Sequence, residues 1–328
     1  MIVFPSHSIN YAVPDNFNEL DRELFYDCNF KNGIQQIEVN DLKNIVVCNN
    51  LVFSNTRMSY EYTRHREPSK KLYFKSLLKK WIVPQDKIEE AYLGIQEWNF
   101  NYFHWMTEVL PALVVINQMK DKRVPVLLSA NSKKCKHIID TLKIFDIPIY
   151  YYNIRQTIKV SNLYAVKIPI VGAYNEPFLS NMRSLFLKNI NVEVKKIPFR
   201  KIYISRKKAT RRKISNEDEL VALLDRYEFE SVFLEDYEIQ DQIKLLQETK
   251  IVVSCHGAGL TNILFMQPDT KVIELKANNN DYWCFFSLAR LANLQYSYLL
   301  CESDRNNHRD ANITVDLVAL EMAVKNYI

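Results

Sequence analysis

The chain has 328 residues, and its 43 Lys and Arg against 38 Asp and Glu give a formal net charge of only +5. Nearly half of the residues (48%) are hydrophobic and 12% are aromatic, whereas only 5 are glycine. This composition excludes disordered, collagen-like and low-complexity chains, and so small a net charge does not indicate a nucleic-acid partner. The length favours two domains with sizeable cores.

The six cysteines stand apart, without a C-x-x-C pair or the spacing of zinc ligands, so reduced thiols are expected. The first seven residues lack the basic and apolar regions of a signal peptide, and no apolar run is long enough to predict a membrane span. We therefore expect a cytoplasmic protein, which could dock at the inner face of a membrane.

The first quarter of the chain is the least informative. Residues 1–90 are expected to form short strands and loops, with apolar runs at 45–48 and 51–53. Residues 70–82 mix lysines with aromatic residues and leucines, which predicts a solvated amphipathic helix. A membrane contact is the alternative interpretation of the same segment.

From residue 124 onwards, apolar runs alternate with helical patterns at the spacing of βαβ units, which predicts a parallel sheet. Strands are expected at 124–128, 147–151, 163–166, 201–205, 230–234, 251–254 and 271–275. Helices are expected at 132–145, 177–190, 217–224, 238–248, 259–265 and 282–292. The pattern breaks near 192–199, which divides the chain into domains of 1–194 and 195–328. The last helix could pack back on the first domain.

A basic loop follows the strand expected at 201–205. In an open parallel sheet, ligands bind beyond the carboxyl ends of the strands, so the residues just after each strand are candidates. Six of the eight residues 206–213 are basic, and a helix begins soon afterwards. Because arginine matches phosphate oxygens in bidentate geometry, anion binding is favoured over a solvated basic loop, with Arg206 and Arg211 as the leading candidates.

A glycine-containing turn follows the strand expected at 251–254 and holds two of the five glycines. Glycine lets a backbone approach a ligand closely, and a helix start offers free N–H groups to a diphosphate. The pattern matches neither the dinucleotide-binding motif nor the P-loop motif. An equally good interpretation is a turn that serves only packing, in which the histidine makes its hydrogen bonds within the protein. The candidate donor-binding residues here are His256, Gly257, Ala258, Gly259, Thr261 and Asn262.

Three further carboxylate and imidazole groups are candidates for ribose binding or for base catalysis. Glu274 lies near the end of its strand, where a carboxylate can accept hydrogen bonds from ribose hydroxyls, or can simply face solvent. His104 and Glu108 would share one face of a helix that begins near residue 103. A carboxylate that holds an imidazole fixes its tautomer, which suits a general base, although such pairs are more often structural.

Taken together, these segments resemble glycosyltransferase family 61 in the order and spacing of their motifs. The motifs are N-Y-F-H-W-M-T-E-V-L-P from residue 101, I-S-R from 204 with R-R at 211 and N-E-D-E-L from 216, and V-S-C-H-G-A-G-L-T-N from 253 with F-M-Q-P and V-I-E-L after it. The resemblance covers roughly 95–280. Asp269 departs from it, because the family usually has glycine after that proline.

The resemblance implies an α/β protein of the GT-B fold, with two Rossmann-like domains whose parallel sheets face each other across a cleft. The C-terminal domain would hold a nucleotide sugar, usually a UDP-sugar, and Asn101, Tyr102 and Trp105 would lie on the acceptor side. The activity implied is that of an inverting transferase, and bacterial members resemble enzymes of capsule, O-antigen or other surface-glycan assembly. The acceptor would be a glycan or a lipid-linked glycan. Neither a cofactor nor a metal is expected, since the chain contains no Asp-x-Asp pair.

In the expected reaction, the donor diphosphate lies against 257–259 and the 206–213 loop, and Glu274 holds the ribose. The acceptor hydroxyl attacks the anomeric carbon in one displacement, after giving its proton to His104 or Glu108. His104 is slightly favoured because an imidazole titrates nearer neutral pH than a carboxyl. The alternative is a catalytically silent subunit that binds a nucleotide sugar or a glycan in an assembly complex. A serine hydrolase is disfavoured because the G-x-S-x-G motif is missing.

Overall fold

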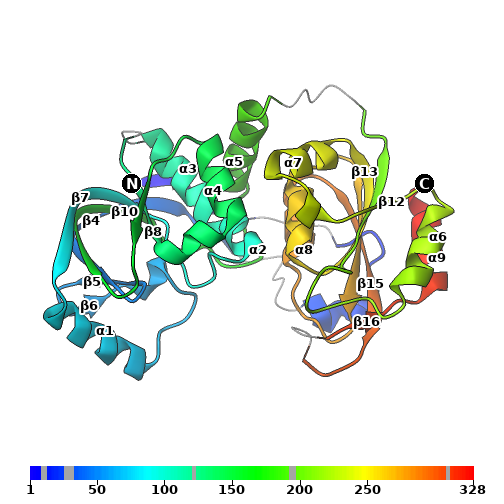
Figure 1. Ribbon diagram of the computed structural model, residues 1–328. Coiled ribbons are helices and arrows are strands. Elements are labelled where there is room, and N and C mark those ends of the chain that lie inside the picture. The colour runs from blue at the N-terminus through cyan, green and yellow to red at the C-terminus, as the bar shows by residue number, and fades with distance from the viewer. Residues whose placement is uncertain (9–12, 26–32, 120–122, 192–196, 308–310) are drawn as a thin grey trace. The chain divides into compact units, whose positions relative to one another are not determined.

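A computed structural model of the chain describes residues 1–8, 13–25, 33–119, 123–191, 197–307 and 311–328. The chain divides into two compact units, and each is described by itself (Figure 1). Unit 1 comprises 1–7, 34–170 and 175–190, and unit 2 comprises 8–33, 171–174 and 191–328. The domain boundary expected between 194 and 195 lies outside the described residues.

Unit 1 is built on a mixed sheet with the strand order β6-β5-β4-β10-β7-β8-β9, and β1 pairs with β4. Its strands are β1 (Ile2–Phe4), β4 (Ile37–Cys48), β5 (Leu51–Ser54), β6 (Arg57–Met58), β7 (Gln85–Leu93), β8 (Val126–Ser129), β9 (Ile149–Tyr152) and β10 (Thr157–Val166). Strands β10, β7, β8 and β9 run parallel. The sequence pattern predicts β8, β9 and β10, whereas the nine-residue strand β7 was not expected. Strands β1, β4, β5 and β6 pair antiparallel, so the expectation of a wholly parallel sheet is wrong for this unit.

A two-residue turn explains the antiparallel part of the sheet. Asn49 and Asn50 join β4 to β5 with φ angles of 50° and 60°, a left-handed conformation that asparagine tolerates. Two successive left-handed residues make the hairpin turn that best matches the twist of the flanking strands. The chain therefore returns beside the strand it has just left, with Cys48 opposite Leu51.

Helices cover the sheet of unit 1. They are η2 (Tyr60–Tyr62), α1 (Lys70–Ile82), α2 (Tyr102–His104), the π-helical turn η3 (Trp105–Val109), α3 (Leu110–Met119), η4 (Ala130–Lys134), α4 (Lys136–Ile144) and α5 (Glu176–Asn189). Figure 1 shows α3, α4 and α5 grouped together, whereas α1 lies apart from them at the edge of the unit. None of the helices in the described part of the chain combines the length and the apolarity that a transmembrane span requires.

Unit 2 contains a six-stranded sheet among its described residues, in the order β12-β11-β13-β14-β15-β16. Its strands are β11 (Arg200–Ile204), β12 (Glu230–Val232), β13 (Thr249–Cys255), β14 (Lys271–Ala277), β15 (Gln295–Ser303) and β16 (Ile313–Thr314). Its helices are η1 (Glu19–Phe25), α6 (Glu217–Asp225), η5 (Leu234–Asp236), α7 (Ile239–Gln247), η6 (Ala258–Phe265), α8 (Cys284–Leu291) and α9 (Leu317–Tyr327). The short strands β2 (His7–Ser8) and β3 (Gly33–Ile34) form a separate two-stranded sheet.

The sheet of unit 2 is parallel from β12 to β15, and only β16 pairs antiparallel. Helices α6 and α9 pack on one face, where Leu224, Val253, Ile273 and Leu320 belong to one buried cluster. Figure 1 shows α7 and α8 on the opposite side of the sheet. The central strand β13 is buried along nearly its whole length, as its apolar sequence predicts for a sheet covered on both faces.

The strands and helices expected from residue 124 onwards are present, with ends that differ by a few residues. The helix expected at 259–265 is a 3-10 helix. Asp269 adopts a φ of 64° in the turn before β14. The turn thus requires the left-handed conformation that glycine adopts most easily, and aspartate supplies it here. Free thiols are found at Cys48, Cys135, Cys255 and Cys301, as expected.

A buried carboxylate ties the end of β11 to the start of α6. Glu217 is only 5% exposed, although the sequence suggested no more than an acidic first turn. Its Oε1 accepts hydrogen bonds from the Tyr203 hydroxyl at 2.8 Å, the Ser205 hydroxyl at 2.6 Å and the Arg206 backbone N–H at 3.2 Å. Because a buried carboxylate is tolerated only when its oxygens are hydrogen-bonded, these contacts hold the 205–206 turn in one conformation.

We expect Glu217→Ala to lower the free energy of unfolding by about 3 kcal/mol, because it leaves buried donors unpaired. Urea denaturation measures the change. Glu219→Ala is the matched control, since Glu219 is exposed in the same helical turn and its loss should change stability by less than about 0.5 kcal/mol. Equal effects of the two substitutions would show that the Glu217 contacts do not stabilise the fold.

Candidate active site

The first candidate constellation lies where α2, η3 and α3 follow one another in unit 1. The Asn101 side chain caps this segment by accepting a hydrogen bond from the Phe103 N–H at 2.9 Å. One turn later, His104 Nδ1 lies 2.6 Å from Glu108 Oε1. The spacing of four residues therefore places the imidazole and the carboxylate side by side, as the sequence predicts, although the turn between them is π-helical.

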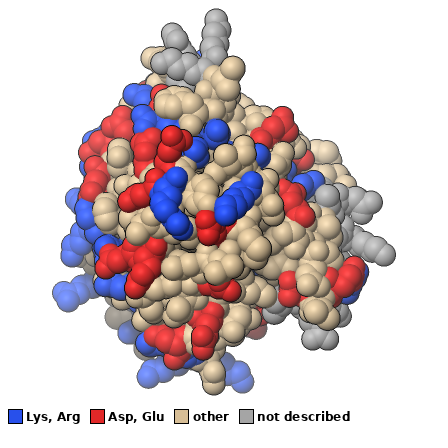
Figure 2. Space-filling model, turned by 90° about the vertical axis from the view of Figure 1, so that its right-hand side faces the viewer, with Lys and Arg blue, Asp and Glu red and all other residues tan. Residues whose placement is uncertain are grey.

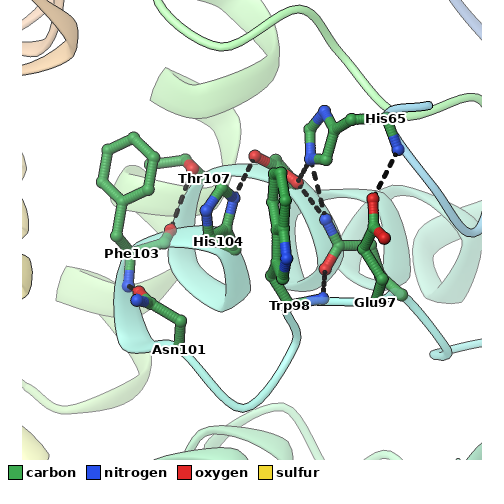
Figure 3. A network of polar contacts seen from close by, with 9 residues as sticks. His65, Glu97, Trp98, Asn101, Phe103, His104 and Thr107 are labelled. Carbon is green, nitrogen blue, oxygen red and sulfur yellow. Dashed lines mark hydrogen bonds and ion pairs between the residues drawn. The ribbon is translucent and has the colours of Figure 1, made fainter. Parts of the chain in front are cut away.

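Two side chains that the sequence did not single out complete the surroundings of Glu108 (Figure 3). Gln96, just after β7, places its Nε2 2.6 Å from Glu108 Oε2. His65, just after η2, places its Nε2 3.0 Å from the same oxygen and stacks on the Trp98 ring at 4.6 Å between centroids. Glu108 itself is 3% exposed, so these partners enclose an almost fully buried carboxylate.

The Gln96 amide lies between Glu108 and His65 and contacts both. The Trp98 backbone N–H donates to Gln96 Oε1 at 2.7 Å, which turns the amide nitrogen toward Glu108 and His65. His65 Nε2 lies 3.0 Å both from this amide nitrogen, which can only donate, and from Glu108 Oε2, which can only accept. His104 Nδ1–H donates to Glu108. The Glu108 contact takes up Nδ1 of His104, so Nε2 is the ring nitrogen left for a substrate.

The same three groups could in principle ligate a metal ion. The ligand atoms of His65, His104 and Glu108 all lie within 4.8 Å of one another. Imidazole and carboxylate are common transition-metal ligands. The Gln96 amide nitrogen, however, contacts both Glu108 Oε2 and His65 Nε2, so an ion bound by these two atoms would have to displace it. Metal independence stays a prediction.

The residues expected on the acceptor side differ in exposure. Asn101 is exposed, and Tyr102 is half-buried with its ring edge-to-face against His137. Trp105 is fully buried, and its indole N–H donates to the Thr141 hydroxyl at 2.8 Å. A direct contact with an acceptor is therefore open to Asn101 and Tyr102, whereas Trp105 packs inside unit 1.

The second constellation lies at the carboxyl ends of β11 and β13 in unit 2. The strand order reverses between these two strands, because β12 lies on the far side of β11 and the later parallel strands lie beyond β13. Ligands of doubly wound sheets bind at such a switch point. A Cβ added to Gly257 would lie 2.3 Å from Arg206 Nη1, so the arginine guanidinium rests directly against the glycine turn. The structure thus brings the two predicted loops together.

Arginine side chains concentrate positive charge beside this turn. The Arg206 Nε donates to the Arg212 carbonyl at 3.0 Å and its Nη2 to the Arg211 carbonyl at 2.9 Å. Burial lowers the pKa of the Arg212 guanidinium, and the neighbouring charges of Arg206 and Arg211 lower it further. The Arg212 Nε is buried without a hydrogen-bond partner within the described residues. A bound anion would relieve both the repulsion and the unmet hydrogen bond.

Two of the three lysines of the same loop form local ion pairs. Lys207 forms an ion pair with Asp218, and Lys208 forms one with Asp236 at 2.5 Å. On the face drawn in Figure 2, basic and acidic side chains are interspersed. Neither observation indicates the broad positive field that nucleic-acid binding requires.

The turn after β13 offers backbone groups more than side chains. The first N–H groups of η6, at 257–259, have no acceptor within the helix. Thr261 and Asn262 are each 1% exposed, and the Asn262 amide donates to Gln242 Oε1 at 3.0 Å. Their side chains therefore lie in the core of unit 2, so a donor could touch this segment mainly through the 257–259 backbone.

Glu274 lies beneath His256. Its side chain is fully buried, with Oε1 2.5 Å from His256 Nδ1 and Oε2 accepting from the Tyr296 hydroxyl at 2.5 Å. Both oxygens are engaged, so Glu274 has no exposed atom for the ribose contact expected from the sequence. His256 is 8% exposed and is the member of the pair that a ligand could reach.

Burial and the neighbouring groups together set the protonation of this pair. Burial lowers the pKa of His256, although the Glu274 carboxylate acts in the opposite direction. Burial would raise the pKa of Glu274, but His256, Lys276 and the Tyr296 hydroxyl together lower it. At neutral pH the pair is therefore a carboxylate that accepts from the Nδ1–H of a neutral imidazole.

We expect His256→Gln to flatten the dependence of stability on pH in weak acid. A histidine whose folded pKa lies below its ordinary 6.5 binds a proton more readily when unfolded, so stability falls as pH drops from 6.5 toward that lower value. Urea denaturation of both proteins between about pH 7.5 and pH 5 measures the slopes. The partly exposed His7, changed to Gln, is the control. Identical slopes in the wild type and His256→Gln would contradict the pKa assignment.

Comparison with known proteins identifies the family. A family model described as Glycosyltransferase 61 matches residues 102–273, just over half of the chain. The match includes His104, Glu108, Arg206 and the 256–262 turn, but not His65 or Gln96.

Named relatives point to the same family. The EGF domain-specific O-linked N-acetylglucosamine transferase of Drosophila melanogaster is 29% identical over 172 residues, which are 49% of this chain and 32% of the relative. The Mus musculus protein of the same name is 32% identical over 139 residues, 38% of this chain and 26% of the relative. The Xenopus laevis protein is 38% identical over 90 residues, 26% and 17% of the two chains. The chain thus spans about a third or less of the length of the curated relatives it matches. The family model and the relatives agree, and the chain belongs to the Glycosyltransferase 61 family.

Proposed function

We propose that the protein is an inverting, GT-B-type glycosyltransferase that moves a sugar from a UDP-sugar to a glycan hydroxyl, without a metal. The observation that carries this proposal is the imidazole of His104, which is held in one tautomer by a buried carboxylate and keeps a lone pair at Nε2. The arginine-lined glycine turn of unit 2 supports a diphosphate-containing donor. The role in surface-polysaccharide assembly rests on the resemblance of the motifs to bacterial members of the family.

In this proposal unit 2 binds the donor. The diphosphate lies against the free N–H groups of 257–259, beside Arg206, Arg211 and Arg212. These groups offset the charge that develops on the leaving nucleoside diphosphate, which a metal ion does in other transferases. His256 contacts the nucleoside, and Glu274 positions His256 from below.

Unit 1 supplies the base. As the acceptor oxygen forms its bond to the anomeric carbon, the bond to the diphosphate oxygen breaks, and the diphosphate leaves with the electron pair. The acceptor proton passes to His104 Nε2, and Glu108 stabilises the imidazolium that forms. Glu108 is less suited to be the base itself, because its side chain is 1% exposed and both oxygens are engaged.

The named relatives favour a second acceptor class. Their names specify N-acetylglucosamine as the sugar and EGF domains as the target, so a protein hydroxyl could replace the glycan hydroxyl. Transfer from UDP-N-acetylglucosamine to an EGF domain, measured beside transfer to glycan and lipid-linked glycan acceptors, separates the two. The surface-polysaccharide proposal includes a cytoplasmic location at the inner face of a membrane. A purified chain that binds donors but neither transfers nor hydrolyses them would instead be a silent binding subunit.

We expect a UDP-sugar to raise the melting temperature, and GDP-, CMP- and TDP-sugars to do so less. A ligand at 100 times its Kd stabilises a fold by about 2.7 kcal/mol, which corresponds to several degrees. EDTA should leave the shift unchanged, and a requirement for a metal would contradict the proposal. Arg206→Gln should weaken donor affinity by about tenfold or more. Lys207→Gln removes the same charge from a side chain paired with Asp218, and it should have little effect.

We expect His104→Ala to lower kcat by about 10³ and Glu108→Gln by about 10², because each removes part of the base. Donor affinity, measured by calorimetry, should stay close to that of the wild type in both. His7→Ala is the control for the loss of a histidine outside the constellation. Full activity in both His104→Ala and Glu108→Gln would exclude this pair as the base.

A further inference from the structure

Helix α1 presents large apolar side chains to solvent. The sequence predicts a solvated amphipathic helix here, and the helix is present, but its outer face is not polar. Phe74, Leu78, Trp81 and Ile82 are 63%, 62%, 70% and 68% exposed. The spacing of 74, 78, 81 and 82 places them on one side of the helix, where they form a contiguous apolar surface. Such surfaces on a folded protein mark binding sites.

The inner face of α1 accounts for this arrangement. Leu72 and Leu77 pack on the small cluster around Phe53. Lys80 also points inward: it is 6% exposed, and its ammonium donates to the Asn55 carbonyl. Burial lowers the pKa of the Lys80 ammonium. The helix therefore buries a lysine while it exposes a tryptophan, so core packing does not explain the residues of the outer face.

The charged side chains of α1 itself have one sign. Lys70, Lys71 and Lys75 are exposed at the N-terminal end of α1, and residues 70–82 contain no aspartate or glutamate. Beside them is a hollow of about 450 Å³ whose lining includes Arg57 and Lys70, together with Glu67. A basic end beside an apolar face that carries a tryptophan is the pattern of helices that lie in the membrane interface.

We propose that the outer face of α1 docks the protein on an anionic membrane surface. Phe74, Leu78, Trp81 and Ile82 enter the boundary between headgroups and acyl chains, and the three lysines contact acidic headgroups. The charge selects this partner, because two copies of the same face would bring like charges together. The proposal does not depend on the identity of the sugar or on catalysis.

Vesicle flotation of the full chain tests the proposal. Binding to phosphatidylcholine vesicles that contain about 30% phosphatidylglycerol should be at least about tenfold tighter than binding to phosphatidylcholine alone, and salt should weaken it. Changing Lys70, Lys71 and Lys75 together to Gln should weaken it by about fivefold per lysine. The triple variant Phe74→Ser, Leu78→Ser and Trp81→Ser should abolish binding to both vesicles.

The matched control is Val318→Ser with Met322→Ser, which removes two apolar side chains of α9 that are 68% and 57% exposed. This variant should bind vesicles as the wild type does. Circular dichroism establishes that each variant is folded, and the assay requires no donor, so its outcome is independent of the transferase proposal. Failure to bind anionic vesicles, or equal binding by the wild type and the α1 triple variant, overturns the proposal. A dimer in solution that the α1 variant dissociates would assign the face to a second copy instead.

Discussion

A carboxylate that is withdrawn from water must have its charge balanced or its oxygens hydrogen-bonded, and this constraint organises both candidate constellations. The carboxylates concerned are those of Glu108, Glu217 and Glu274, which are 3%, 5% and 0% exposed. Each lies directly beneath a residue that a ligand could reach: His104 in unit 1, and Arg206 and His256 in unit 2. The buried group holds its partner in one tautomer or one backbone position before any substrate arrives. This is the preorganisation on which electrostatic catalysis depends, because the enzyme does not have to reorient its groups during the reaction.

The parts of this arrangement that could be predicted are those with a local cause. The central strands of unit 2 are recognisable because both faces of their sheet are covered, which demands nearly unbroken apolar runs. His104 and Glu108 could be paired from their spacing alone. The importance of Gly257 could be suspected from its place after a strand, but the reason for it could not. Its φ of 179° is ordinary extended backbone, which any residue adopts. Glycine is needed here because Arg206 Nη1 occupies the space that the Cβ of any other residue would fill.

The parts that could not be predicted depend on contacts between distant segments. His65 reaches Glu108 across 43 residues and carries no motif of its own. Thr261 and Asn262 follow the glycine turn directly, yet the rotation of a 3-10 helix turns both into the core. Glu274 sits where a ribose-binding carboxylate is expected, but strand geometry cannot reveal that neighbouring side chains already take up both of its oxygens.

The π-helical turn η3 has a consequence for how relatives of this chain can be compared. A π turn holds one residue more than an α-helical turn and often marks a single-residue insertion. Helix α3 is held in place by a nearly continuous buried surface. If one residue were removed from 105–109, the residues before the deletion would therefore shift, and His104 would rotate about the helix axis by roughly 100°. A homologue with a one-residue gap at this place could therefore retain a histidine and a glutamate in the alignment while their side chains no longer meet. Helix length across η3, as much as residue identity, decides whether the pair exists.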